Sequence, residues 1–181
     1  MADPSSDLRG DTLDARVRAA DIDRWLSSRF VADAGLRADL IALYAFEAEL
    51  MAIPTRVTQP LLAEMRYVWW REQMDGVFAG VARKGHPVLE ALTDGVARHG
   101  LDRGPFDALI EAHIGRVHGE PHDLDAFYVG PMQAAVRVLA GPGLDAAVVD
   151  AGRVRGFAQT GQVDQAKALR GKANRALSGL P

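Results

Sequence analysis

The chain has 181 residues, of which 48% are hydrophobic and 25% are charged, a balance typical of one globular domain and not of a disordered chain. It contains no cysteine, so disulfide bonds, cysteine nucleophiles and thiolate metal sites are excluded. A net charge of −3 argues against nucleic acid as a partner, and no apolar run reaches the roughly 18 residues of a membrane span.

The first residues, MADPSSDLRGDTLDA, are polar and acidic, unlike a signal peptide or a transit peptide. We therefore expect a flexible N-terminal tail over residues 1–10 and a single domain over residues 11–181. The expected location is the cytoplasm, with peripheral attachment at the inner membrane as the alternative.

Helix-forming residues dominate the chain, and the alternating pattern of β-strands is absent. Apolar residues at helical spacing, with Gly or Pro breakers between them, predict eight helices. Pro54 should end the second helix, and Thr58 should cap the third. The expected fold class is therefore all-α, a helical bundle. In chain order the expected helices cover residues 11–31, 36–53, 58–81, 88–98, 105–117, 123–139, 144–158 and 163–177, with Asp123 or Asp125 as the cap of the sixth.

Apolar stripes along these helices indicate which faces should be buried. The second helix is apolar nearly all round, which predicts a central position in the bundle. The third carries two stripes, which predicts burial on two sides. The residues expected to be buried are Val17, Ile22, Leu26 and Phe30 in the first helix, and Leu61, Met65, Val68, Trp70, Met74, Val77 and Val81 in the third.

Three groups of polar residues could carry chemistry, and each has an ordinary structural alternative. Clustered histidines with nearby aspartates could bind a metal ion, but their spacing favours a solvated turn. Carboxylates four residues apart could hold Mg²⁺, but arginines at the same spacing favour surface charge ladders. A basic C-terminal helix could contact anionic lipid, but a solvated face is the default. The histidine cluster is His113, His118 and His122 with Asp123 and Asp125. The carboxylate pairs are Glu90–Asp94 and Asp107–Glu111, with Arg98 and Arg103 as the nearby arginines. The basic residues of the C-terminal helix are Lys167, Arg170, Lys172 and Arg175.

The adjacent tryptophans Trp69 and Trp70 are the most unusual local feature. Neighbouring residues on a helix point about 100° apart, so the two rings should pack on different sides. Arg66 and Arg71 flank them and could bind phosphate. The alternative is ion pairing with one of three glutamates, Glu47, Glu49 or Glu64.

Two stretches of the chain resemble a known family. Residues 43–50 read LYAFEAEL, and residues 64–72 read EMRYVWWRE. The second stretch is followed by Gly80 and by HPVLEAL at residues 86–92, with a weaker likeness over residues 106–112. In order and spacing, these segments are similar to the LYAF, R-x-x-W-W-R, G and HPV-x-x-AL segments of the squalene/phytoene synthase family.

The resemblance covers residues 22–112 and implies the all-α terpenoid-synthase fold. Members of this family condense two allylic diphosphates, and two aspartate-rich helical motifs bind the Mg²⁺ ions that ionise the substrate. At the first motif, residues 51–55 of this chain read MAIPT, without a carboxylate. In the region of the second motif, residues 157–170 offer only Asp164. Typical members also continue with further helices, so we expect a bundle shortened at its C-terminus.

One branch of the family contains the mitochondrial assembly factor of respiratory complex I and reads AFN-x-EL where the enzymes carry aspartates. The text FEAEL at residues 46–50 resembles it, and also resembles the LYAFNAEL of bacterial relatives. The resemblance implies a bacterial, non-catalytic protein without a cofactor that acts in assembly or holds an isoprenoid or lipid ligand. A protein partner or a second copy of the chain could complete the shortened bundle.

The alternative is an active, Mg²⁺-dependent prenyl transferase that condenses farnesyl or geranylgeranyl diphosphates. It would need substitute carboxylates, for which the candidates are Glu47, Glu49, Asp107 and Glu111. We predict no catalytic residue and no metal ligand, only a set of candidate cavity residues: Leu43, Tyr44, Glu47, Met51, Arg66, Trp69, Trp70 and Arg71. Leu43 and Met51 should face this cavity, and Tyr44 or Phe46 should pack in the core. In a dry cavity, Met51→Asp would cost several kcal/mol.

Overall fold

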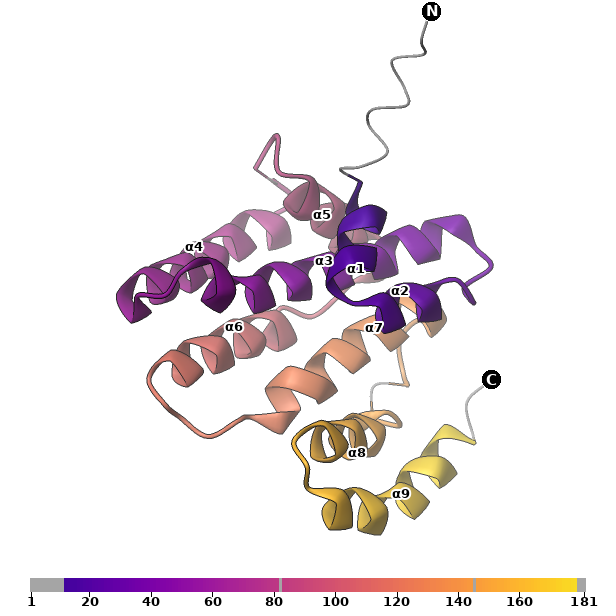
Figure 1. The fold of residues 1–181 in the computed structure, drawn as a ribbon. Coiled ribbons are helices and arrows are strands. Elements are labelled where there is room, and N and C mark those ends of the chain that lie inside the picture. Colours follow the sequence, from indigo (N-terminus) through magenta and orange to yellow (C-terminus); the bar gives the residue numbers. More distant parts are fainter. Residues whose placement is uncertain (1–11, 82, 145, 179–181) are drawn as a thin grey trace, which may run out of the picture.

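The computed structural model describes residues 12–81, 83–144 and 146–178, and all regular structure within these residues is helical (Figure 1). The all-α fold class predicted from the sequence is therefore confirmed. In this described part of the chain, no helix combines the length and apolar character needed to cross a membrane. The elements are α1 (Leu13–Ala20), α2 (Ile22–Ser28), α3 (Ala34–Arg56), α4 (Pro60–Phe78), α5 (Pro87–His99), α6 (Gly104–Val117), the short π-helix η2 (Asp125–Val129), α7 (Gly130–Ala140), α8 (Val149–Gln159) and α9 (Val163–Leu177).

Helix α3 lies at the centre of the bundle and packs against α1, α2, α4, α5 and α7. Phe46, in the middle of α3, is buried as predicted. Its ring centroid lies 5.5 Å from that of Trp70 on α4 and 5.6 Å from that of Phe106 on α6. The nearly all-round apolar sequence of α3 thus corresponds to a helix that has neighbours on most sides.

The N-terminal segment forms two helices and not the single one predicted over residues 11–31. Asp21 separates them with an extended backbone, and its side chain accepts a hydrogen bond from the backbone N–H of Arg24 in the first turn of α2. An aspartate that caps a helix in this way favours a new helix start. Of the residues predicted to be buried here, Val17 is buried. The prediction is wrong for three others, which are exposed: Ile22, Leu26 and Phe30.

Helix α3 continues past Pro54 to Arg56, so the prediction that Pro54 ends this helix is wrong. Proline lacks the N–H that would bond to the carbonyl four residues earlier, which here belongs to Leu50. The hydroxyl of Tyr67, on α4, donates a hydrogen bond of 3.2 Å to this carbonyl. A neighbouring helix thus supplies the donor that the proline lacks.

Helix α4 is buried on one side only, although two buried sides were predicted. It begins at Pro60, with Gln59 and not Thr58 at the N-cap position, and ends before Val81. It packs against α3, α5 and α6, and the predicted stripe that faces them is buried: Trp70, Met74 and Val77. The other predicted stripe faces away from these helices, and its residues are half-buried or exposed: Leu61, Met65 and Val68.

The later helices agree with the predictions where a local signal marks their ends. Gly100, with φ +58°, follows the last residue of α5, and α9 has the predicted bounds Val163–Leu177. The single helix predicted over residues 123–139 is instead η2 followed by α7. Helix α8 begins at Val149 rather than at Leu144.

Helix α8 packs tightly on η2 through two glycines. A Cβ atom on Gly152 would lie 2.9 Å from the Cα of Val129, and one on Gly156 would lie 2.8 Å from a tyrosine ring of η2. Arg153 donates hydrogen bonds of 2.8 and 2.5 Å to the carboxylate of Asp125 across the same contact. Helix α9 packs on α8, and the two lie at the end of the molecule away from α4 and α5 (Figure 1).

Candidate functional site

An open cleft with a volume of about 600 Å³ lies between the α1–α2 corner, α3, α6, η2 and α8. This volume is within the range of small-molecule binding sites. Its wall mixes charged side chains with aromatic and aliphatic ones. The residues that define the cleft are Ala20, Asp21, Asp23 and Arg24; Tyr44, Glu47, Ala48, Met51 and Ala52; Leu109, His113 and Arg116; His122, Phe127 and Tyr128; and Arg155 and Gln159.

One face of α3 supplies five of these residues. Tyr44, Glu47, Ala48, Met51 and Ala52 follow one another at helical spacing, which places them on the same side of the helix. Met51 and Ala52 lie within residues 51–55, the stretch in which the resemblance places the first metal-binding motif of the family. The cleft face of α3 therefore carries a single carboxylate, that of Glu47.

Glu47 forms an ion pair with Arg24 of α2. The Glu47 Oε1 and Arg24 Nη1 atoms are 2.5 Å apart, and both side chains are largely buried. Arg24 also lies 3.4 Å from the carboxylate of Asp21 and over the ring of Tyr44. Burial alone would lower the pKa of Arg24, but the Glu47 carboxylate, together with Tyr44 and Asp21, outweighs burial and raises it. Glu47 is therefore committed to an ion pair and is not free to bind a metal ion.

Two histidines form an uncharged part of the cleft wall. His113 is buried between the rings of Tyr67, at 5.1 Å, and Phe127, at 4.8 Å, so the solvated turn predicted for it is wrong. Burial, together with the charges of Arg116 and His122, lowers the pKa of His113 to about 4. Burial and Arg116 also lower the pKa of His122, whose ring stacks on Phe127 at 4.3 Å. Near neutral pH both rings act as aromatic surfaces and not as charges.

Two arginines, Arg116 of α6 and Arg155 of α8, line the cleft without an ion-pair partner among the described residues. The guanidinium of Arg116 lies 5.6 Å from the ring centroid of Phe127. Arg155 also lines a hollow of about 100 Å³ that it shares with Arg24 and Tyr44. The cleft thus combines two exposed guanidinium groups with an aromatic wall.

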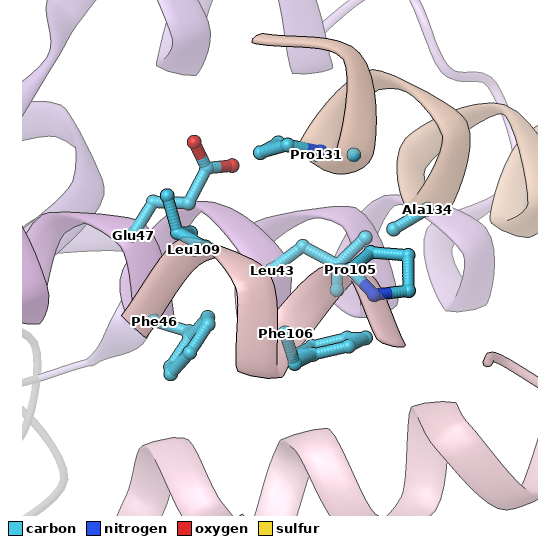
Figure 2. Close-up of a pocket in the computed structure, with 9 residues that line it drawn as sticks. Leu43, Phe46, Glu47, Pro105, Phe106, Leu109, Pro131 and Ala134 are labelled. Atoms are coloured by element: carbon cyan, nitrogen blue, oxygen red, sulfur yellow. The ribbon is translucent and has the colours of Figure 1, made fainter. Parts of the chain in front are cut away.

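A second, narrow pocket of about 20 Å³ lies beside Glu47 (Figure 2). Phe46 and Phe106 line it together with Leu43, and Figure 2 shows the Glu47 carboxylate pointing away from the two rings. Its volume holds about one water molecule. The larger cleft is therefore the candidate site.

The structure brings three of the eight predicted cavity residues together in the cleft. These are Tyr44, Glu47 and Met51, whereas Leu43 is buried and lines the narrow pocket. Met51 is 56% exposed, so its expected place in a dry cavity is wrong. Because exposed positions tolerate polar residues, we now expect Met51→Asp to change the free energy of unfolding by about 0.5 kcal/mol or less.

The other four predicted residues are on α4 and lie outside the cleft. Trp70 is buried against Phe46 and the ring of His86, and Trp69 also reaches His86 at 5.7 Å between ring centroids. The His86 Nδ1 accepts a hydrogen bond from the backbone N–H of Leu89 in the first turn of α5. The two tryptophans and His86, the first residue of the HPVLEAL segment, therefore form a packing contact between α4 and α5.

The ion pairs of α4 differ from the predicted ones. Arg71 pairs with Glu111 of α6 at 2.6 Å, Glu64 lies 3.3 Å from His118, and Arg66 is exposed. The four candidate substitute carboxylates occupy four separate ion pairs: Glu47–Arg24, Glu49–Arg56, Glu111–Arg71 and Asp107–Arg103, the last being a surface ladder that was predicted. Over the described ranges, no group of three or more His, Asp or Glu side chains is placed to hold a metal ion.

One buried carboxylate outside the cleft was not expected. Asp39 of α3 accepts hydrogen bonds of 2.5 Å from Arg98 and lies 2.8 Å from the Nε2 of His99. The ladder predicted between Arg98 and Asp94 is therefore replaced by a contact that joins the end of α5 to α3. This group holds the end of α5 against α3, and none of its members lines the cleft.

Sequence reasoning missed most of the wall opposite α3. Arg155 and Gln159 come from α8, where no motif was recognised, and Arg116 was passed over between two histidines. Phe127 and Tyr128 belong to η2. A π-helix is frequent at functional sites. The adjacent aromatic residues Phe127 and Tyr128 were the one feature of the sequence that could have indicated this wall. The sequence alone does not distinguish a π-helix from the start of an α-helix.

The family model described as squalene/phytoene synthase matches residues 17–128, more than half of the chain. The matched range includes α3 and α6 and most of η2, so it contains every wall of the cleft except that of α8. No curated protein and no solved structure matches the chain. On the family match, the chain belongs to the squalene/phytoene synthase family.

Proposed function

We propose that this protein is a non-catalytic member of the family that binds an isoprenoid or lipid ligand in the cleft. One observation carries the proposal. The cleft face of α3 presents Met51 and Ala52, and its single carboxylate, Glu47, is paired with Arg24. Ionisation of a diphosphate by Mg²⁺ needs carboxylates that are free to hold the metal. The cleft face of α3 offers none.

The cleft wall suits a ligand with an apolar chain. Tyr44, Met51, Leu109 and Phe127 supply aromatic and aliphatic surface, and the neutral histidines add more. Burial of apolar surface supplies roughly 25 cal/mol per Å². A long hydrocarbon chain would therefore be the main source of affinity, and no cofactor is required.

The test is a thermal melt with geranylgeranyl diphosphate, with and without Mg²⁺, followed by a turnover assay. Ligand at about 100 times its Kd adds about 2.7 kcal/mol, which raises Tm by several degrees for a chain of this size. We expect the same rise with and without Mg²⁺, and no condensed product. A rise that requires Mg²⁺ and is accompanied by product would contradict the proposal and favour a prenyl transferase. No rise in either condition would contradict ligand binding and favour an assembly role with a protein partner.

Two variants on α3 form a matched control. Ala48 lines the cleft, whereas Ala38 is exposed elsewhere on the same helix. Ala48→Phe should fill part of the cleft and reduce the rise in Tm caused by the ligand, relative to the melt of the same variant without ligand. Ala38→Phe should leave that rise unchanged. Equal rises in both variants would mean that the ligand binds outside the cleft.

A gain of metal dependence provides a second test. Met51→Asp combined with Ala52→Asp places two carboxylates on the cleft face of α3. Because Mg²⁺ prefers oxygen ligands and bridges them to phosphates, the double variant should bind the diphosphate more tightly when Mg²⁺ is added. Affinity that stays indifferent to Mg²⁺ in this variant would contradict the idea that the missing carboxylates decide metal use.

A further inference from the structure

We infer that the cleft binds the anionic head of its ligand directly through Arg116 and Arg155, without a bridging metal ion. The ligand class is a phosphate or diphosphate ester of an apolar alcohol. This inference rests on the proposed function, since it names the chemistry by which the same cleft would recognise its ligand.

Arg116 presents an uncompensated positive charge at the cleft. It is exposed, and among the described residues no carboxylate lies within ion-pair distance of its guanidinium. The ring of Phe127, 5.6 Å away, holds the guanidinium against an aromatic face. The lowered pKa values of His113 and His122 leave both rings neutral near pH 7. Arg116 is therefore the charged group of this part of the wall.

Arg155 approaches the cleft from α8, which is fixed on η2. Gly152 and Gly156 bring the two helices into close contact, and Arg153 pairs with Asp125 across the same contact. Arg155 itself is exposed, and within the part of the chain that the structure describes it has no carboxylate partner. The docking of α8 holds the backbone of Arg155 beside the cleft, and its planar guanidinium can make two parallel hydrogen bonds to a phosphate.

The acidic side chains of the cleft do not compensate these two arginines. Glu47 pairs with Arg24, and Asp21 both caps α2 and contacts Arg24. Asp23 is exposed to solvent. A divalent cation would find one uncommitted carboxylate, whereas a phosphate would find two guanidinium groups that can each donate charge-assisted hydrogen bonds. The charge distribution therefore favours an anion over a cation.

The test compares three probes by calorimetry in the presence of EDTA: geranylgeranyl diphosphate, geranylgeraniol and inorganic pyrophosphate. The diphosphate should bind more tightly than either of the other two. Arg116→Gln and Arg155→Gln should each weaken its binding about tenfold or more, because each removes a charge-assisted hydrogen bond. Neither change should alter the affinity for geranylgeraniol. Arg66→Gln, at an exposed arginine of α4 outside the cleft, is the matched control and should bind like the unmodified chain.

The outcomes separate the inference from the proposed function. Diphosphate binding that requires Mg²⁺, or that is unchanged in both cleft variants, overturns the inference and leaves ligand binding in place. Pyrophosphate bound as tightly as the ester overturns the ligand class, because the apolar chain would then contribute nothing. An unmodified chain that binds neither the diphosphate nor geranylgeraniol, with or without Mg²⁺, overturns the proposed function itself.

Discussion

Tyr67 and Pro54 form a coupled pair that a double-mutant cycle can test. Pro54 lies inside α3 and leaves the carbonyl of Leu50 without its usual N–H donor. The Tyr67 hydroxyl donates to this carbonyl over 3.2 Å, and Tyr67 and Leu50 are both buried. Burial raises the pKa of Tyr67 to about 12, so the hydroxyl keeps its proton at any pH suitable for the assay. Water cannot replace this donor without entering the core.

Tyr67→Phe removes the donor and changes the shape of the side chain little. A buried carbonyl without a partner costs about 1–3 kcal/mol, so we expect the free energy of unfolding to fall by about 2 kcal/mol. Pro54→Ala restores an N–H that can bond to the Leu50 carbonyl. In that background Tyr67→Phe should cost less than about 1 kcal/mol, which gives an interaction free energy of about 1 kcal/mol or more between the two positions.

Urea denaturation of the four proteins measures the cycle. Tyr128→Phe serves as the control, because the Tyr128 hydroxyl makes no hydrogen bond to the described residues, and its free energy of unfolding should change by less than about 0.5 kcal/mol. Equal costs of Tyr67→Phe with and without Pro54 would refute the reasoning, because the hydroxyl would then not stand in for the missing N–H.

Three further predictions concern buried or tightly packed groups. The pKa of His113 is lowered to about 4 in the folded chain, so between about pH 4 and pH 6.5 the unfolded chain binds more protons than the folded one. The free energy of unfolding therefore decreases as the pH falls through this range. In urea, His113→Phe should therefore lose about 2 kcal/mol of the stability difference between about pH 7.5 and pH 5, and an unchanged pH dependence in this variant would contradict the argument. Gly152→Ala should destabilise by about 1–3 kcal/mol in the same assay, because its Cβ would meet the backbone of η2, while Gly171→Ala on α9 should be neutral or stabilising; similar effects of the two would contradict the packing argument. Asp39→Asn should lower Tm by several degrees, since the change weakens the contact of a buried carboxylate with two basic partners, and an unchanged Tm would mean that this contact contributes nothing.

Helix positions could be predicted from the sequence wherever the signal is local. The bounds of α9 follow from its amphipathic period, and Gly100 ends α5 because glycine adopts the left-handed conformation readily. Pro54 was misjudged because the compensating donor, Tyr67, belongs to another helix. The exposed stripe of α4 was misjudged for a related reason, since periodicity identifies an apolar face but not whether a neighbour covers it.

The site was predictable on one wall and not on the other. Tyr44, Glu47 and Met51, in and just after the LYAF segment, were predicted as cavity residues, and all three line the cleft. Arg155 lies outside the matched range and reaches the cleft only because α8 docks on η2. Trp69 was predicted as a cavity residue, yet its ring packs against His86 between α4 and α5. A rare local sequence such as the tryptophan pair therefore marks a packing contact here and not a chemical site.

The docking of α8 links ligand affinity to local stability. Arg155 can reach a bound anion only when α8 is packed on η2, so a ligand that uses Arg155 must stabilise this contact. Gly152→Ala should then weaken diphosphate binding, although Gly152 does not line the cleft. The diphosphate should also slow hydrogen exchange of the α8 amides more than geranylgeraniol does. Equal exchange of α8 with both probes would place the anion elsewhere on the cleft wall, with Arg116 and without Arg155.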